Sequence, residues 1–351
     1  MNTHWQDFLN RRGARVAEDG TIRFAEASQP QDSEPSACAL FDLSHLGLIA
    51  VRGEDAESFL QGQLTNDIRE VSPSHTQLSG HCSPKGRLLA CFRVLRLGEG
   101  IHLQLPRERV ADALKRLRLY VLRAKVTLED VSDDLIRVGV AGDCAPSALE
   151  RAGLAVPGRD EDLTTTGAIS VVRLPSPSPR FELIGPLETM RVLWDALAQT
   201  ATPSTADIWA LHDIRGGVPN VYQETVEAFV PQMLNLQLID GVSFNKGCYT
   251  GQEVVARMQY LGKLKRRMYW AEVEADTQPR PGEALYAPRS TSEQATGRVV
   301  DARPSGPGRF ELLAVVEIDA AEGGEVRLAE QGPLLRLRPP PYGFPQETAH
   351  D

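Results

Sequence analysis

The groups best suited to chemistry in this sequence lie in one octapeptide, KGCYTGQE, at residues 246–253. Its thiol, Cys248, comes just before a segment with helical periodicity, and a helix N-terminus stabilises a thiolate. Lys246 adds a second positive group nearby. We therefore expect Cys248 to be a reactive thiolate that Lys246 keeps anionic, and these two residues are the catalytic candidates. The alternative is a small cysteine that fills a tight, buried turn.

The same octapeptide predicts the start of a helix. Thr250 and Glu253 have the spacing of a capping box, so a helix should cover about residues 251–259. The octapeptide's glycines carry no side chain, so a ligand or partner can approach the backbone closely. The apolar residues expected on the buried face of this helix are Val254, Val255 and Met258.

Further candidates for ligand binding lie elsewhere in the chain. Asp67 follows Thr-Asn in a turn-prone stretch, where a carboxylate can accept hydrogen bonds from the amines or amides of a heterocycle; it can equally be a turn-forming residue. Trp209 and Arg215 can sandwich a planar ring between an indole and a guanidinium, although Trp209 also suits a core. A basic turn of sequence SPKGR supplies Lys85 and Arg87.

The elements that must position these groups change in kind along the chain. Up to about residue 260, strand patterns such as 46–51, 88–97 and 101–105 mix with helical patterns such as 187–197 and 206–213. That mixture, without a strict βαβ rhythm, predicts an α+β fold. After residue 262 we find short strand patterns, Gly- and Pro-rich turns and no helical periodicity, which predicts a small antiparallel barrel or sandwich.

Length and composition restrict the class of protein to which this chain can belong. The chain has 351 residues, of which 42% are apolar and 24% charged, as in globular proteins of two or three domains. Its formal charge of −9 argues against direct nucleic-acid binding, which needs a broad basic face. No apolar run reaches the ~18 residues of a membrane span. The first residues have no apolar signal core, so we expect a cytoplasmic protein with no membrane partner.

The cysteines form no recognisable ligand set. There is no C-x-x-C pair, so no zinc or iron–sulfur site is indicated locally, and we predict no metal ligands. An odd number at scattered positions fits a reducing compartment. The five cysteines are Cys38, Cys82, Cys91, Cys144 and Cys248.

The octapeptide resembles the K-G-C-Y-x-G-Q-E motif of the YgfZ-type folate-binding proteins. The segments FVPQ, NL and GVSF, between residues 229 and 244, precede it as they do in that family, and the KGR of the basic turn also fits. Residues 53–67 resemble the first helix and N-D turn that the family shares with the aminomethyltransferase (T-protein) of the glycine cleavage system. The resemblance covers about residues 38–265.

This resemblance implies a three-lobed, aminomethyltransferase-like fold around a central tetrahydrofolate pocket. Two interleaved α+β lobes would make up residues 1–260, one from about 38–140 with 206–260 and the other from 141–205. Residues 261–351 would form a C-terminal antiparallel β-barrel domain.

The resemblance also suggests which residues meet the folate. Asp67 falls where the transferase has its pterin-binding catalytic aspartate. The transferase has a pterin-contacting glutamate in an R-L-E-A-G stretch, but the corresponding residues here, 213–217, read DIRGG and lack that acid. The residues that we expect to bind tetrahydrofolate are Asp67, Trp209, Arg215, Tyr249, Gln252, Glu253, Lys85 and Arg87.

Three functions were weighed on these grounds. The favoured one is a tetrahydrofolate-binding accessory factor that supports assembly or repair of iron–sulfur clusters, and thereby tRNA modification. Its partners would be iron–sulfur proteins or their assembly factors. The alternative is a folate-dependent aminomethyl or one-carbon transferase, which would make the protein an enzyme; that question stays open here. A tRNA-binding module is disfavoured by the negative charge.

Overall fold

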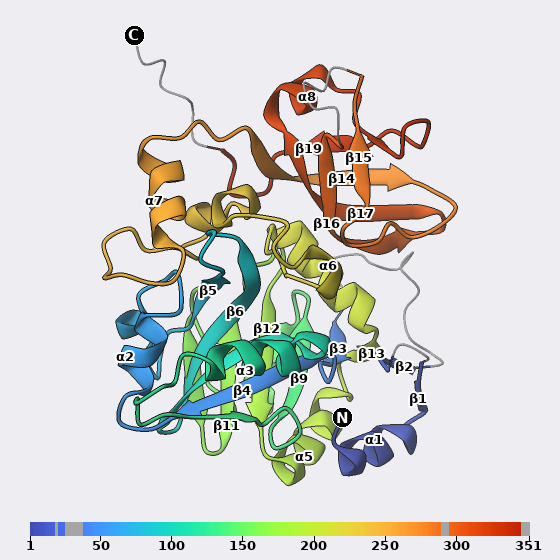
Figure 1. Ribbon diagram of the computed structural model, residues 1–351. Helices are drawn as coiled ribbons and strands as arrows, with labels where there is room; N and C mark the ends of the chain where they lie inside the picture. Colours follow the sequence, from blue (N-terminus) through green and yellow to red (C-terminus); the bar gives the residue numbers. More distant parts are fainter. Residues whose placement is uncertain (18–19, 25–37, 289–294, 345–351) are drawn as a thin grey trace.

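Three large sheets organise the chain, and Figure 1 shows the C-terminal one, in orange and red, set beside the other two. The computed structural model describes residues 1–17, 20–24, 38–288 and 295–344. The first two sheets mix with helices and the third is almost purely β, so the predicted α+β fold with a C-terminal β domain is confirmed. Among the helices of these described ranges, none is long and apolar enough to cross a membrane.

The first lobe is an antiparallel sheet with strands in the order β5-β6-β7-β4-β8. Its elements are β4 (Leu46–Arg52), α2 (Ala56–Gln61), β5 (Gln77–Cys82), β6 (Leu88–Leu97), β7 (Gly100–Pro106), α3 (Val110–Arg118) and β8 (Thr127–Asp130). Helices α2 and α3 cover one face, and their apolar side chains form one cluster with those of the central strands. The hairpin expected from the patterns at 88–97 and 101–105 is confirmed as β6 and β7.

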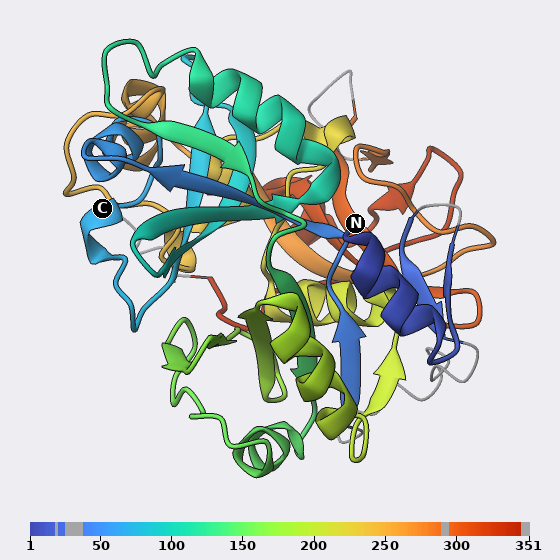
Figure 2. The ribbon, with the colours of Figure 1, turned by 90° about the horizontal axis from the view of Figure 1, so that it is seen from below.

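The second lobe is a sheet in the order β10-β11-β12-β9-β3-β13. Its elements are α1 (Thr3–Asn10), β3 (Ala39–Asp42), β9 (Ile136–Ala141), α4 (Ala145–Arg151), β10 (Leu163–Thr166), β11 (Ile169–Arg173), β12 (Arg180–Gly185), α5 (Leu187–Leu197) and β13 (Thr202–Ser204). The N-terminal helix α1 packs on this lobe (Figure 2). Its Trp5 meets Trp194 of α5 edge-on at 5.6 Å. Strand β3, and β9 except for its last residue, fall within residues 38–140, yet they pair in this sheet.

The C-terminal sheet has the order β18-β15-β16-β17-β14-β19 and curls into a half-barrel. Its elements are β14 (Arg266–Glu274), β15 (Ala284–Tyr286), β16 (Gly297–Gly306), β17 (Arg309–Glu317), α8 (Ile318–Gly323), β18 (Arg327–Leu328) and β19 (Arg336–Arg338). The sequence showed no helical periodicity here, and the one helix of this domain's described residues, α8, is only six residues long. It ends at Gly324, whose φ of 73° only glycine adopts readily.

Helix α6 (Ala206–Gly216) connects the three parts (Figure 1). Thr205 caps its start, and Gly217 ends it in the left-handed conformation at φ 69°. The indole of Trp209 packs against Gly139 of β9, where an added Cβ would come within 2.4 Å of the ring. At the other end, Arg215 donates two hydrogen bonds to Glu311 of the half-barrel, at 2.8 and 3.0 Å. One helix thus fixes the half-barrel against the second lobe.

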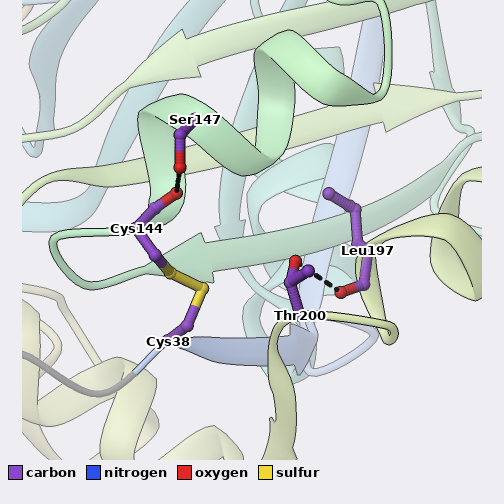
Figure 3. Close-up of a disulfide and its surroundings, with 5 residues drawn as sticks. All are labelled: Cys38, Cys144, Ser147, Leu197 and Thr200. Carbon is purple, nitrogen blue, oxygen red and sulfur yellow. Dashed lines mark hydrogen bonds between the residues drawn. A yellow bond between two sulfur atoms is a disulfide. The ribbon is translucent and has the colours of Figure 1, made fainter.

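Two of the five cysteines are joined, which the sequence interpretation did not foresee. Cys38, just before β3, and Cys144, at the start of α4, form a disulfide with their Cα atoms 5.7 Å apart (Figure 3). The bond links positions 106 residues apart, so cysteine spacing gave no sign of it. It fastens the beginning of β3 to the helix that follows β9. A disulfide is not what the odd, scattered cysteine count led us to expect, since that count was read as typical of a reducing compartment.

Candidate functional site

The octapeptide forms an irregular loop that leads into α7 (Gln252–Tyr260), but the expected capping box is absent. Gly251 takes the N-cap position at φ 83°, and no side chain caps the helix. The backbone N–H of Thr250 instead donates to Gly62, at the end of α2. The structure describes every residue of α7, and Val255 is the only one of them that is buried. The prediction that Val254 and Met258 share that buried face was wrong.

Cys248 is exposed, whereas the other two free thiols are buried. Cys82 lies on β5 and Cys91 on β6, inside the protein. Burial raises the pKa of Cys82 to about 12 and raises the pKa of Cys91 further. A thiol must ionise to act as a nucleophile, so these two are chemically quiet at neutral pH. Among the five cysteines, Cys248 is thus the thiol offered to solvent.

Lys246 points into the protein. Its side chain is only 6% exposed, and Nζ donates to the backbone oxygens of Leu64 at 2.6 Å and Asn66 at 2.8 Å. The Tyr249 ring lies 5.2 Å from the same nitrogen. Burial lowers the pKa of Lys246 to about 8, although the Asp67 carboxylate opposes the shift. This lysine ties the octapeptide to the loop that follows α2.

Asp67 sits on that loop, and its carboxylate already has partners. Arg69 donates to it from both the guanidinium and the backbone N–H, and Gln61 donates from Nε2 at 3.0 Å. These hydrogen bonds, led by that of the Arg69 side chain, hold the pKa of Asp67 well below its ordinary value. Asp67 is therefore a buried, ionised residue that orders the turn. Its negative charge also favours the protonated form of Lys246.

The basic turn packs against the start of α7. A Cβ at Gly86 would lie 2.6 Å from Val254, and one at Gly251 would lie 2.5 Å from the Ser83 oxygen, so both glycines are required for this close approach. Arg87 donates to the Ala228 oxygen at 2.9 Å. The structure thus brings together one group of the predicted site residues. That group is Cys248, Lys246, Tyr249, Gln252, Glu253, Asp67, Lys85 and Arg87.

Trp209 and Arg215 do not belong to that group and do not form the predicted sandwich. They are six positions apart on α6, which places their side chains about 120° apart around the helix axis. The guanidinium over the Trp209 ring, at 4.7 Å, belongs to Arg180 of β12. Arg215 faces Glu311 of the half-barrel instead. One face of the Trp209 ring is thus occupied by Arg180 of the protein itself.

A small cavity of about 50 Å³ lies where the two lobes and α6 meet, and Trp209 is part of its wall. Its polar lining includes Arg93 of β6, Gln104 of β7 and Glu182 of β12, together with Asp213 of α6 and Asn220. Gln104 donates to Glu182 at 2.8 Å, and burial raises the pKa of Glu182. Oε1 of Gln104 is buried and has no hydrogen-bond partner among the described residues. An unpaired buried carbonyl is costly and marks a place where a donor is missing.

A larger cleft of about 590 Å³ continues from this cavity, because Leu46, Asp213 and Asn220 line both. Its walls include residues from α1, from the end of β7, from the start of α6 and from the half-barrel. Sequence reasoning missed the polar lining of the cavity. The available signal was charge within mostly apolar strands, such as Arg93 in β6 and Glu182 in β12, since buried charge needs a reason.

The sequence comparisons decide the family. A family model described as the GCVT N-terminal domain matches residues 26–161. The "tRNA-modifying protein YgfZ" of Yersinia pestis (strain Pestoides F) is 31% identical over 92% of this chain and 97% of its own length. The protein of the same name from Klebsiella pneumoniae (strain 342) is 32% identical over 90% of this chain and 96% of its own.

The chain belongs to the YgfZ family.

The structural comparison agrees with this YgfZ assignment at the level of fold. The aminomethyltransferase T of the glycine cleavage system from Bartonella henselae superimposes with a TM-score of 0.76, covering 96% of each chain at 17% identity. That likeness shows a shared fold and confirms the aminomethyltransferase-like architecture that the octapeptide resemblance implied. In this YgfZ chain, the polar cavity sits between the two lobes, and the cysteine loop lies on the side of the first lobe formed by α2 and the basic turn.

Proposed function

We propose that this protein is a cytoplasmic, tetrahydrofolate-binding accessory factor that supports iron–sulfur cluster assembly or repair and, through it, tRNA modification. The tRNA link comes from the printed name of its relatives, and the folate link from the fold it shares with an aminomethyltransferase. The observation that carries the folate part is the unpaired Gln104 oxygen in a polar cavity between the lobes. The observation that carries the second part is the exposed thiol of Cys248.

The chemistry of the cavity suits a pterin. A pterin presents several amine, amide and ring-nitrogen groups in one plane, and the cavity offers an amide, a carboxylate and a flat indole from Gln104, Glu182 and Trp209. The present volume holds only one or two water molecules, well below the roughly 300–1,000 Å³ of typical ligand sites. Binding therefore requires these side chains or the lobes to move apart. The adjoining cleft of about 590 Å³ has the size for the rest of the molecule.

In this proposal, one set of residues binds the folate and another presents the thiol. Gln104 and Glu182 would orient the folate by hydrogen bonds, and Trp209 would stack on its ring. The folate, when bound, supplies a carrier for one-carbon units. Lys246 anchors the loop that presents Cys248, and neither of these residues lines the cavity or the cleft. A thiol held away from the folate cavity is better placed to meet a partner protein than a folate-bound substrate.

Calorimetric titration with tetrahydrofolate tests the folate part. We expect Gln104→Leu to bind at least about tenfold more weakly than wild type, because one hydrogen bond to a buried group is worth about 1–3 kcal/mol and 1.4 kcal/mol is tenfold. Gln77→Leu is the matched control: Gln77 is also buried with unpaired amide atoms among the described residues, but it does not line the cavity. A loss with Asp67→Asn but not with Gln104→Leu would instead place the pterin at the cysteine loop. No binding to wild type would refute the folate role.

A complementation assay tests the thiol. In cells deprived of this protein, wild type should restore the nucleosides made by iron–sulfur-dependent tRNA-modifying enzymes, as measured by mass spectrometry of digested tRNA. With Cys248→Ser, the modified fraction should fall toward that of the deprived cells, because a hydroxyl cannot replace a thiolate as ligand or nucleophile. Cys144→Ser, which removes only the disulfide, is the comparison variant. Full rescue by Cys248→Ser would exclude a role for the thiol.

The second candidate is the folate-dependent one-carbon transferase. Although the transferase's glutamate has no counterpart in residues 213–217, two carboxylates, Glu182 and Asp213, do line the cavity. Asp213 is paired with Arg180 at 2.6 Å, which leaves Glu182 as the available acid. Single-turnover incubation with tetrahydrofolate and an aminomethyl donor separates the two functions. The accessory factor forms no methylenetetrahydrofolate above background, whereas the transferase does.

A further inference from the structure

Helix α7 presents an apolar stripe to solvent. Val254, Met258 and Leu261 follow one another at the i, i+4 and i+7 spacing of a buried helix face. The structure leaves Val254 37% and Leu261 85% exposed, and Tyr260 beside them is 67% exposed. Such a stripe is normally covered, and a contiguous exposed apolar surface on a soluble protein marks an interaction site. Val255 buries one side of α7 and the basic turn touches Val254, whereas Met258 is half-buried and Leu261, just past the end of the helix, is largely open to solvent.

Positive charges border this stripe. Arg257 lies on the same helix, and Lys263 and Lys265 follow it, all exposed. Lys85 projects from the basic turn that touches Val254. None of these four cations forms an ion pair within the described part of the chain. Glu253, in the first turn of α7, is the acidic residue beside them, so the surface is positive on a protein whose net charge is −9.

The stripe is continuous with the loop of Cys248. The thiol precedes α7 by four residues and is exposed, and Figure 1 shows α7 at the margin of the molecule, away from the half-barrel. We propose that Val254, Met258 and Leu261, with Arg257, Lys263 and Lys265, form a docking face for an acidic, apolar segment of a partner protein, which is thereby brought to Cys248. The identity of that partner as an iron–sulfur protein rests on the proposed function; the docking does not.

The composition of the face favours a protein over an RNA. Protein interfaces have an apolar centre and a charged rim, and helix-in-groove contacts use i, i+4, i+7 anchors. RNA binding instead relies on several stacked aromatic rings along a basic path. None of the six residues that make up this face is aromatic, and the ring of the neighbouring Tyr260 already meets Phe244 edge-on at 6.0 Å. The acidic character of the partner follows from the four cations.

Site-specific crosslinking tests the proposal. The full chain carries benzoyl-phenylalanine at position 261, or at position 192 as the control, in cells whose own copy has been replaced. Val192 is an aliphatic residue on α5 that is 73% exposed but stands alone. We expect position 261, and not 192, to crosslink to a protein through an acidic segment. A crosslink to RNA alone, equal crosslinks at both positions, or none at all would overturn the proposal.

The affinity of the purified partner for variants of the docking face then tests which residues of the face contribute to binding. Leu261→Asp and the double variant Lys263→Glu/Lys265→Glu should each weaken its binding at least tenfold, while Val192→Asp stays within twofold of wild type. Unchanged affinity of both face variants would overturn the proposal. Tetrahydrofolate titration of the same variants separates the two ideas: if wild type binds the acidic partner but no folate, the proposed function fails and the docking face stands. If wild type binds folate but Leu261→Asp binds the partner as tightly as wild type, the docking-face proposal is overturned and the proposed function is not.

Discussion

Iodoacetamide at pH 7.5 is expected to alkylate Cys248 at least about 100-fold faster than Cys82 or Cys91 in the native protein. A thiol with the pKa of about 12 shown by Cys82 is about 3,000-fold less ionised at this pH than one near 8.5. The greater nucleophilicity of such a basic thiolate recovers only part of that difference. Burial then denies the reagent access to both internal thiols.

Peptide mapping by mass spectrometry over a time course measures these rates. Cys38 and Cys144 are joined, so they should label together and only after a reductant is added. Unfolding in urea provides the internal control, because all free thiols should then react at similar rates. Early labelling of Cys82 or Cys91 with Cys248 inert would contradict the exposed-thiol site and leave the octapeptide a structural turn.

Replacing Lys246 by methionine should lower the free energy of unfolding by about 2–4 kcal/mol. The substitution leaves the backbone oxygens of Leu64 and Asn66 without their donor, and a buried acceptor without a partner costs about 1–3 kcal/mol. Lys85→Met is the matched control, since Lys85 is an exposed lysine on the adjoining turn. Its effect should stay within about 0.5 kcal/mol. Urea unfolding at pH 7 gives the comparison.

The same variant should reveal the low pKa of Lys246 through the pH dependence of stability. The pKa is about 8 in the folded protein against an ordinary value of 10.5. Between these two values the unfolded chain binds more protons than the native one, so stability rises with pH. Wild type should therefore gain stability relative to Lys246→Met from pH 8 to 10, by at most about 1.4 kcal/mol per pH unit. Curves that stay parallel over this range would contradict a buried, weakly basic lysine.

Local periodicity was enough to predict much of the fold. The hairpin of β6 and β7, the helix α5 and the strands of the half-barrel follow from alternation and helical spacing, because each buries one face against a neighbour. The small helix α8 was missed because one turn and a half is too short to show a period. The disulfide was missed because nothing in the spacing of Cys38 and Cys144 says that their strands are neighbours.

The candidate site was predicted only in part, for reasons of geometry. The octapeptide, Asp67 and the basic turn do meet, since a family resemblance carries their arrangement in space. The capping box failed because Gly251 adopts a left-handed conformation at the N-cap position. Gln104, Glu182 and Arg93 were overlooked because each lies in a mostly apolar strand whose pattern does not show what its side chain faces. Their convergence is a property of two sheets facing each other, which no short window of sequence contains.

The strand order of the second lobe has a consequence for protein synthesis. Strand β3 ends at Asp42, but its antiparallel partner β9 begins at Ile136 and its parallel partner β13 at Thr202. The whole first sheet, from β4 to β8, is made in between. At roughly 5–20 residues per second, a ribosome takes on the order of 5–20 s to deliver β9 after β3. The nascent chain therefore carries a short unpaired apolar strand while the first lobe closes, and it relies on that lobe folding early to keep β3 apart from other chains.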